Sequence, residues 1–398
     1  MGSKFLKEPK FYSGMSFPHA SLGMIDPAEH RIRRRVLAPV FSPEGVLAHS
    51  TWIEERLGQL MRRFEQMADK GLPVNVERAF KSFTTDVISK IVLGKEFGLL
   101  EDEGFDDLRL HILHETIRKS WTYRAFPMTF ALLMSLPQRL SKRLFQIPIL
   151  EIAKECHERI TAYTTRKSNG DQVEEKSIED GEDCMLLDRM LDSQAAPDYR
   201  VPHVDILTEE ALTLVSAGYD STAISMLLGF FYICRDQAVY GALEAELDSS
   251  LADEGSSSFK ELRKLPYLNA VVKEIFRCSH PFPGRLPRVV PAEGYTLLGH
   301  KLQPGTIIHT SAYLLNRNTS IWGSDANEFN PNRWLHGKCA DQEKYMATFN
   351  KGSRQCLGMN LAWSELTLML ATMLRKFRIS IHDTVESDME WNDHLFMM

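Results

Sequence analysis

The spacing of apolar residues predicts a mainly helical chain. Residues 76–94 (VERAFKSFTTDVISKIVLG) repeat apolar side chains at steps of three and four and end on Gly94, a common helix stop. Short β-rich runs, separated by Gly299 and by the Pro304–Gly305 pair, predict a small sheet within residues 289–311. The same helical pattern covers residues 43–70, 104–120, 139–165, 184–193, 208–235, 238–251, 267–278 and 359–375. We therefore expect a mainly α single domain with many helices and a small β-sheet portion.

Residues 166–183 (RKSNGDQVEEKSIEDGED) contain almost no apolar side chains and carry both charges, which predicts an exposed loop rather than a linker between domains. The N-terminal MGSKFLKEPKFYSG lacks the apolar core that a signal peptide requires. The apolar stretch at 125–137 contains prolines and is shorter than the ~20 residues that span a bilayer. No anchor or targeting signal is visible, so the sequence assigns the chain no location.

The composition excludes one class of partner and one kind of site. Lysine and arginine total 47 against 53 aspartates and glutamates, and the net charge is −6. Because the surface is not generally basic, nucleic acid is not an expected partner. The six cysteines form no Cys-x-x-Cys pair and no metal-like spacing, and most lie in apolar helical segments. This usage indicates free thiols in a reducing compartment.

One cysteine stands apart from the others. In FNKGSRQCLG (349–358), Cys356 comes immediately before the predicted helix 359–375. The unpaired N–H groups of a helix start would then face its sulfur, and Arg354 adds positive potential, so the site is expected to favour the thiolate. Gly352 and Gly358 would let a flat apolar cofactor approach the backbone.

A thiolate in this position has three common uses. A nucleophile needs a nearby base, and no histidine lies in the segment. An iron–sulfur ligand needs three companion cysteines with suitable spacing, which the chain does not have. The axial ligand of a haem iron needs no partner, because the sulfur itself donates electron density to the metal. The alternative without chemistry is a buried, inert cysteine beside a glycine turn.

The pattern Phe349-x-x-Gly352-x-Arg354-x-Cys356-x-Gly358 resembles the haem-binding loop of the cytochrome P450 family. The resemblance implies a P450-like fold around haem b, iron protoporphyrin IX. It implies that Cys356 is the metal ligand and that the other four residues contact the cofactor.

Two further segments occur in the order that the family requires. Glu274 and Arg277 lie three residues apart, on one face of a predicted helix, which alone would indicate a surface ion pair. Arg333 follows in FNPNRW (329–334). Together they resemble the family's Glu–Arg–Arg cluster, which implies a structural role, since an unpaired buried charge costs several kcal/mol.

The helix predicted at 208–235 contains SAGYDSTA at 216–223. A glycine in the middle of a helix lowers helix stability by ~1 kcal/mol relative to alanine, so Gly218 is expected to have a specific role. Ser221 and Thr222 can bond back to carbonyls one turn earlier and bend the helix, which would open a groove for dioxygen. The alternative is a kinked core helix whose hydroxyls are satisfied internally.

The same stretch is similar to the family's oxygen-activation motif, Ala/Gly-Gly-x-Asp/Glu-Thr-Thr/Ser. The resemblance implies that Gly218 borders the cofactor and that Asp220, Ser221 and Thr222 handle oxygen and protons. Ser221 stands where the family usually has threonine. Since serine lacks the methyl group and the stiff rotamer, looser control of water is implied.

Residues 29–43 (EHRIRRRVLAPVFSP) place four arginines beside a histidine. Alone, the cluster would indicate a solvated cationic face or a polyanion-binding patch. By resemblance, His30 and Arg34 contact the haem propionates, as does Arg288 in LPRVVP. Arg33 and Arg35 would then face outward, where an acidic reductase domain could dock.

The resemblance extends from about residue 25 to 395 and is greatest to filamentous-fungal enzymes of secondary metabolism. It implies a monomeric monooxygenase that oxidises an apolar small molecule of polyketide or terpene type. The reaction would use O2 and electrons from an NADPH-cytochrome P450 reductase. A full-length form with the family's anchor would lie on the cytosolic face of the endoplasmic reticulum.

Against the family pattern, the chain is expected to lack the N-terminal anchor and first strands and the last C-terminal strands, as if truncated at both ends. Two alternatives therefore stay open. One is a haem-thiolate isomerase or dehydratase, and the other is a truncated, non-catalytic remnant.

Overall fold

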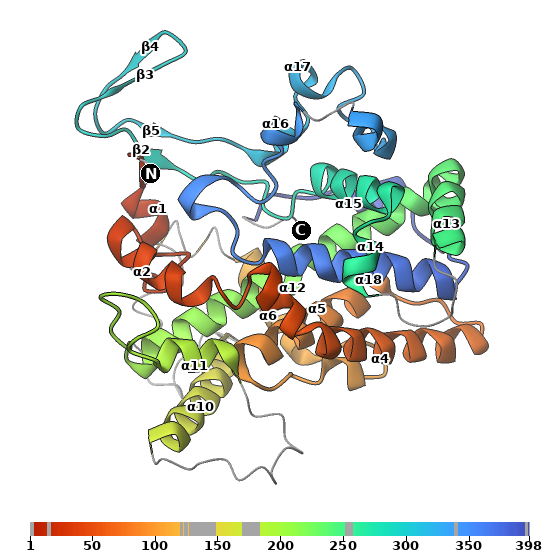
Figure 1. Ribbon diagram of the computed structural model, residues 1–398, viewed down its shortest axis with the longest axis horizontal. Helices are drawn as coiled ribbons and strands as arrows, with labels where there is room; N and C mark the ends of the chain where they lie inside the picture. Colours follow the sequence, from red (N-terminus) through yellow and green to blue (C-terminus); the bar gives the residue numbers. More distant parts are fainter. Residues whose placement is uncertain are drawn as a thin grey trace.

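A computed structural model describes residues 4–13, 17–119, 122, 126, 149–168, 184–250, 258–337, 341–394 and 397. Helices make up most of these residues, and the short strands gather at one end of the molecule (Figure 1). Most of the loop predicted at 166–183 lies outside the described residues, because only 166–168 belong to them, as the end of a helix.

The helices are α1 (Pro9–Ser13), α2 (Pro27–Leu37), α3 (Pro43–Ala48), α4 (Ser50–Asp69), α5 (Val76–Leu93), α6 (Leu108–Arg118), α10 (Ile149–Ser168), α11 (Met185–Leu191), α12 (Val204–Arg235), α13 (Gln237–Ser250), α14 (Phe259–Leu262), α15 (Pro266–Cys278), α16 (Ala312–Asn316), α17 (Thr319–Trp322) and α18 (Met359–Lys376). The strands are β1 (Leu6–Lys7), β2 (Arg288–Val289), β3 (Tyr295–Leu297), β4 (His300–Leu302) and β5 (Ile307–Ile308).

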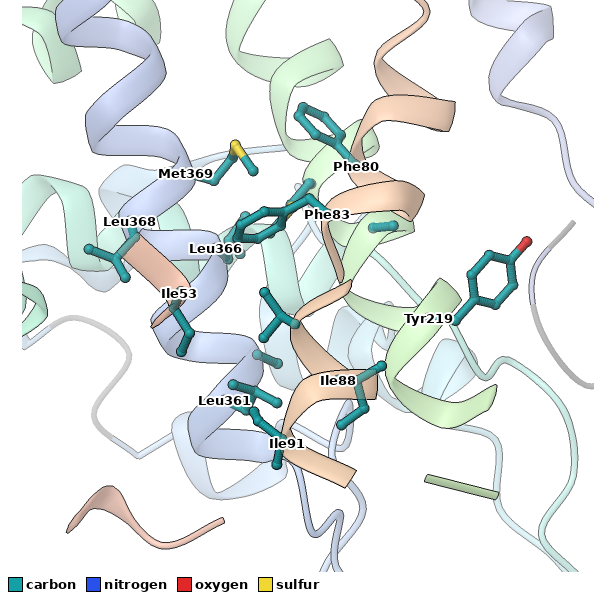
Figure 2. Packing of buried hydrophobic residues seen from close by; sticks show 14 of the residues in the cluster. Ile53, Phe80, Phe83, Ile88, Ile91, Tyr219, Leu361, Leu366, Leu368 and Met369 are labelled. Atoms are coloured by element: carbon teal, nitrogen blue, oxygen red, sulfur yellow. The ribbon is translucent and has the colours of Figure 1, made fainter. Parts of the chain in front are cut away.

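Helix α12 runs through the centre of the core and packs against α5, α10, α15 and α18. It is long and apolar enough to span a membrane, but 72% of its most apolar window is buried inside the protein, as in the core helix of a folded protein. Figure 2 shows Leu361 and Leu366 of α18 directed toward Ile91 and Phe83 of α5. The site is therefore held by tightly packed helices.

The predicted late sheet is present, and it has a strand that the sequence did not predict. Strands β1, β2 and β5 form an antiparallel sheet, in which Lys7 lies opposite Arg288 and Leu6 opposite Val289. Strands β3 and β4 form a separate hairpin. The unpredicted strand is β1, which brings the N-terminal segment beside β2 (Figure 1). The expectation that the chain lacks the family's first strands stays a prediction.

Helix ends differ from the prediction where a side chain caps the backbone. The helix expected at 43–70 is two helices, α3 and α4, which meet at His49. Helix α6 begins later than predicted because the Asp107 carboxylate accepts a hydrogen bond from the Arg109 N–H. Helix α12 begins four residues early, because the His203 side chain caps the N–H of Asp205. Helix α5 ends as predicted, at Gly94 in the left-handed conformation.

Candidate functional site

The loop that carries Cys356 leads into α18. A short 3-10 helix, Gly352–Arg354, precedes it, and the Cys356 N–H donates to the Phe349 carbonyl at 2.8 Å. Gly352 has a φ of +78°, a conformation that favours glycine. A Cβ atom added at Gly352 or Gly358 would meet nothing within 4 Å, so both glycines border open space.

The thiol of Cys356 is free and lies two residues after Arg354. The side chain of Cys356 is exposed at the protein surface. The surrounding protein nevertheless desolvates the thiol, and this desolvation is the largest cause of its raised pKa. The Gly358 N–H and Arg34 act in the opposite direction but do not outweigh burial. The prediction that the helix start and Arg354 lower the pKa of the thiol is therefore wrong, because desolvation of the thiol exceeds their effect. A bound metal ion would deprotonate the sulfur directly.

Beside this loop lies a cationic cavity of about 420 Å³. The predicted residues His30, Arg34, Arg288, Gly352 and Arg354 all line it, so the structure brings together segments up to 324 positions apart (30 to 354). Among the described residues that line it, none is acidic; the others are Phe5, Leu6, Lys7, Ile25, Pro27, Arg31, Arg35, Ala38 and Ser353.

No acidic side chain accompanies the basic side chains among the described residues that line this cavity. Burial, then Arg354 and Arg288, lowers the pKa of Lys7 to about 6. Burial and Arg288 lower the pKa of Arg354 to about 10, and burial with Arg354 lowers that of His30 to about 3. Their donors find only neutral acceptors: Lys7 reaches the Leu22 carbonyl at 2.6 Å. Such a set fits a ligand with two carboxylates, since buried positive charge is stabilised by an opposite charge within reach.

Two contacts tie the cavity to the cysteine loop. Arg34 donates to the Gln355 carbonyl at 2.6 Å and approaches the Cys356 carbonyl at 3.5 Å. Arg354 extends the other way and donates to the Met24 carbonyl at 2.8 Å. Phe349 lies behind the loop, edge-on to Phe276 with ring centroids 4.8 Å apart. The loop is thus fixed from both sides.

Gly218 has a packing role. A Cβ atom there would lie 2.7 Å from Cγ1 of Ile88 on α5, so α12 and α5 can approach this closely only with glycine at 218. The expectation that Gly218 also borders the cofactor stays a prediction. Ser221 donates back to the Ala217 carbonyl at 2.7 Å, as predicted, but α12 stays one continuous helix from Val204 to Arg235.

Asp220 is fully buried on the side of α12 that faces α5. Its Oδ1 lies 3.1 Å from Nζ of Lys81, whose side chain is 9% exposed. Burial raises the pKa of Asp220, and Lys81 partly offsets this. Thr222 is buried beside it, whereas Ser221 is only partly buried. The acid and the serine hydroxyl therefore lie in different surroundings.

The Glu–Arg–Arg cluster forms as predicted. Glu274 is fully buried and accepts two hydrogen bonds from Arg277, at 2.8 and 2.9 Å, and one from Arg333 at 2.9 Å. The indole N–H of Trp334 and the N–H of Asn330 also donate to it, both at 2.8 Å. The five donors satisfy the carboxylate and brace the segment that leads to the cysteine loop.

The outward-facing pair predicted on α2 is only half correct. Arg35 is exposed, but Arg33 is buried, and its Nη1 lies 2.8 Å from Oε2 of Glu210 on α12. Ser21 also donates to Glu210, at 2.6 Å. Arg33 therefore joins α2 to α12 and is not available to a docking partner.

Comparisons with known proteins agree with this arrangement. A family model described as "Cytochrome P450" matches residues 3–398. The chain belongs to the cytochrome P450 family.

Among curated proteins, this P450 is similar to cytochrome P450 monooxygenase sol6 of Alternaria solani, 37% identical over 90% of this chain and 76% of the relative. It is also similar to the monooxygenases macH of Penicillium terrestre (31% identical, 98% and 76% covered) and penB of Penicillium thymicola (28%, 99% and 88%). The chain is accordingly a cytochrome P450 monooxygenase, and the isomerase alternative is not supported.

Solved structures show the same fold. A cytochrome P450 (CYP102L1) has a TM-score of 0.78 at 18% identity, with 100% of this chain and 83% of that chain covered. The cytochrome P450DA haem domain has a TM-score of 0.77 at 18% identity, with 99% and 80% covered. The mainly α prediction is confirmed. Family and fold imply a haem cofactor, which the cationic cavity and the open space at the two glycines fit.

Sequence reasoning missed two residues of this region, Lys7 and Lys81. Lys7 reaches the cavity because β1 pairs with β2, a register that involves residues 281 positions apart (7 to 288). Lys81 reaches Asp220 across the α5–α12 contact. Neither partner is visible in the local sequence.

Proposed function

We propose that Cys356 is the axial thiolate ligand of haem b in this monooxygenase and that the cavity cations hold its two propionates. The proposal rests on a free, exposed thiol two residues after Arg354. Arg354 lines a cavity that has many basic side chains and no acid among its described lining residues. When bound, haem supplies the dioxygen chemistry that a monooxygenase needs.

The chain's own residues would bind and orient this cofactor. Arg34, Arg288 and Arg354 offer guanidinium groups that match carboxylates, and Lys7 adds a buried amine whose charged form a carboxylate would stabilise. Gly352 and Gly358 leave the backbone accessible, since no side chain fills the space beside them. Phe349, packed on Phe276, keeps water from the back of the loop.

On α12, Asp220 would hold a proton close to the reaction site. Burial raises the pKa of Asp220, so this carboxyl group keeps its proton to a higher pH than an exposed aspartate does. The hydroxyls of Ser221 and Thr222 would orient water and dioxygen. We infer looser control of water than threonine at 221 would give, because the serine side chain lacks the methyl group.

The substrate that we propose is an apolar small molecule of polyketide or terpene type, oxidised with O2 and electrons from an NADPH-cytochrome P450 reductase. Support comes from the fungal monooxygenases to which the chain is similar. P450 monooxygenases generally take electrons from a redox-partner reductase. We propose that the protein acts as a monomer and that a full-length form with the family's anchor would lie on the cytosolic face of the endoplasmic reticulum.

The decisive test is the absorbance spectrum of the reduced, carbon-monoxide-treated protein. We expect a strongly red-shifted Soret band in the wild type and its loss in Cys356→Ala. Cys234→Ala, which removes another free cysteine, on α12, is the matched control and should keep the band. A red-shifted band in Cys356→Ala would overturn the assignment. A wild-type protein with no Soret band would favour the non-catalytic remnant.

A further inference from the structure

Lys7 is placed in the cationic cavity by the pairing of β1 with β2, in which it lies opposite Arg288 (Figure 1). Because side chains alternate along a strand, Leu6 is exposed and Lys7 is buried, with 5% of its surface accessible. The Nζ of Lys7 donates to the Leu22 carbonyl at 2.6 Å and lies 4.5 Å from the centre of the Tyr12 ring. The amine is therefore held in the cavity wall by a neutral acceptor and an aromatic face.

Other basic groups face Lys7 from the elements around it. Arg288 belongs to β2 and Arg354 to the cysteine loop, and both lower the pKa of Lys7. His30 and Arg34 on α2 line the same cavity, and Lys7 and His30 lower each other's tendency to hold a proton. A charge on Lys7 is thus opposed by its surroundings from three sides.

The nearby acids bind backbone groups elsewhere. Glu8 follows Lys7, but its carboxylate oxygens accept two N–H groups from the first turn of α1, at 3.1 and 2.5 Å. Asp26 accepts two N–H groups at the start of α2. The Tyr12 hydroxyl accepts a hydrogen bond from Arg288 at 2.7 Å. Among the described residues, no acid is a cause of the changed pKa of Lys7.

Only two kinds of base in the described cavity lining can change their charge near neutral pH. The arginines stay protonated, since even Arg354 has its pKa lowered only to about 10. Burial and the arginines lower the pKa of Lys7 to about 6, and burial with Arg354 lowers that of His30 to about 3. An opposite charge nearby shifts a pKa by about 1–3 units. Two carboxylates therefore suffice to bring the pKa of Lys7 above neutral pH, but not that of His30.

We propose that Lys7 couples cofactor binding to the uptake of a proton: its amine is neutral when no carboxylate lies beside it and becomes an ammonium when the propionates do. The proton comes from water and forms a bond with the lone pair of Nζ. No electrons move and no other bond breaks. Lys7 is thus a positioning residue whose charge appears together with the ligand that needs it. This inference rests on the proposed function, since it takes the two carboxylates to be those of haem.

The first test follows haem loss from the ferric holoenzyme to excess apomyoglobin between pH 7.5 and 9.5. For a rise of about 2–3 units in the pKa of Lys7, we expect Lys7→Met to lose haem about 4–30-fold faster than the wild type at pH 7.5. The difference should appear in the loss rate, because affinity changes at one site lie mostly in dissociation. At pH 9.5 the two rates should nearly agree, since the wild-type amine is then neutral as well.

Two variants separate this proton uptake from a purely structural role. Lys7→Arg carries a charge that does not titrate in this range, so the ratio of its rate to that of Lys7→Met should stay constant with pH. Lys4→Met removes a lysine of the same N-terminal segment whose side chain is 74% exposed and pairs with Glu293. It is the matched control and should behave as the wild type at every pH.

The second test observes the amine itself. In 15N-lysine-labelled holoenzyme, reduced and carbon-monoxide-bound, the Nζ signal of Lys7 is identified by its loss in Lys7→Arg. Its titration midpoint is compared with that in holoenzyme whose haem has been exchanged for haem dimethyl ester, in which both propionates are uncharged. We expect a midpoint about 1–3 pH units lower with the ester.

Equal midpoints with haem and its ester would overturn the proposal, and so would a ratio of Lys7→Met to wild-type rates that does not change with pH. Should Lys7→Met fail to fold, the comparison of the wild type with Lys7→Arg and the ester experiment still decide the matter. Failure of the haem assignment would appear separately, as a red-shifted Soret band that persists in Cys356→Ala.

Discussion

Replacing Glu274 with glutamine isolates the contribution of charge inside the Glu–Arg–Arg cluster. The glutamine side chain has nearly the same size, but it leaves Arg277, whose side chain is fully buried, without a carboxylate. Arg333 is less affected, because its Nη2 also lies 2.9 Å from Asp325. Among the described residues, the remaining hydrogen-bond partners of Arg277 are the carbonyls of Asn316, Ala326 and Glu328 and Sγ of Cys278.

The expected cost follows from that burial. Breaking a buried pair by removing one partner typically costs about 3–5 kcal/mol. At about 2.1 cal/mol/K per residue, the 398 residues unfold with an entropy of about 0.8 kcal/mol/K, so Tm should fall by about 4–6 °C. The assay is thermal unfolding of the holoenzyme followed by circular dichroism.

Glu115→Gln is the matched control, since Glu115 pairs with Arg118 at the same three-residue spacing but in an exposed position. Exposed pairs contribute about 0–1 kcal/mol, so its Tm should change by about 1 °C or less. If Glu274→Gln lost no more than Glu115→Gln, the claim that this cluster braces the segment before the cysteine loop would be refuted.

Two further predictions concern the core and the cavity. Gly218→Ala should destabilise the protein by about 1–3 kcal/mol, because its Cβ would overlap Ile88, and Ile88→Ala should relieve the loss in the double variant. The measurement is the urea midpoint, and a midpoint equal to or above the wild type would contradict the packing role. His30 has its folded pKa lowered to about 3, chiefly by burial, so the folded protein binds fewer protons than the unfolded chain between pH 3 and about 6.5. Its contribution to stability is therefore full above this window and lost as the pH falls through it. Urea midpoints across the window should fall less steeply in His30→Gln, and equal slopes would contradict this account.

The sequence predicted those parts of the site whose residues are neighbours along the chain. The loop from Phe349 to Gly358 and the Glu274–Arg277 pair each lie within one turn or one segment, so their spacing already restricts their geometry. Helix α5 was predicted for the same reason, because its apolar repeat and Gly94 are local features.

Other features depended on partners far away in the chain. Gly218 is explained by Ile88, which lies 130 residues earlier (88 to 218). Arg33 could have been placed from its spacing, since it lies three residues after buried His30 and four before buried Leu37 on the inner face of α2. The direction of the Cys356 pKa required the surrounding packing, because desolvation depends on every neighbouring segment.

The pairing of β1 with β2 has a consequence for biosynthesis. Lys7 is translated 281 residues before its cross-strand neighbour Arg288 (7 to 288). At about 5–20 residues per second, the first strand leaves the ribosome about 15–55 s before its place in the sheet exists. Throughout that interval the nascent chain must keep Leu6–Lys7 from joining a wrong edge. The cationic cavity, which Lys7 and Arg288 both line, can close only after the last third of the polypeptide has begun to emerge.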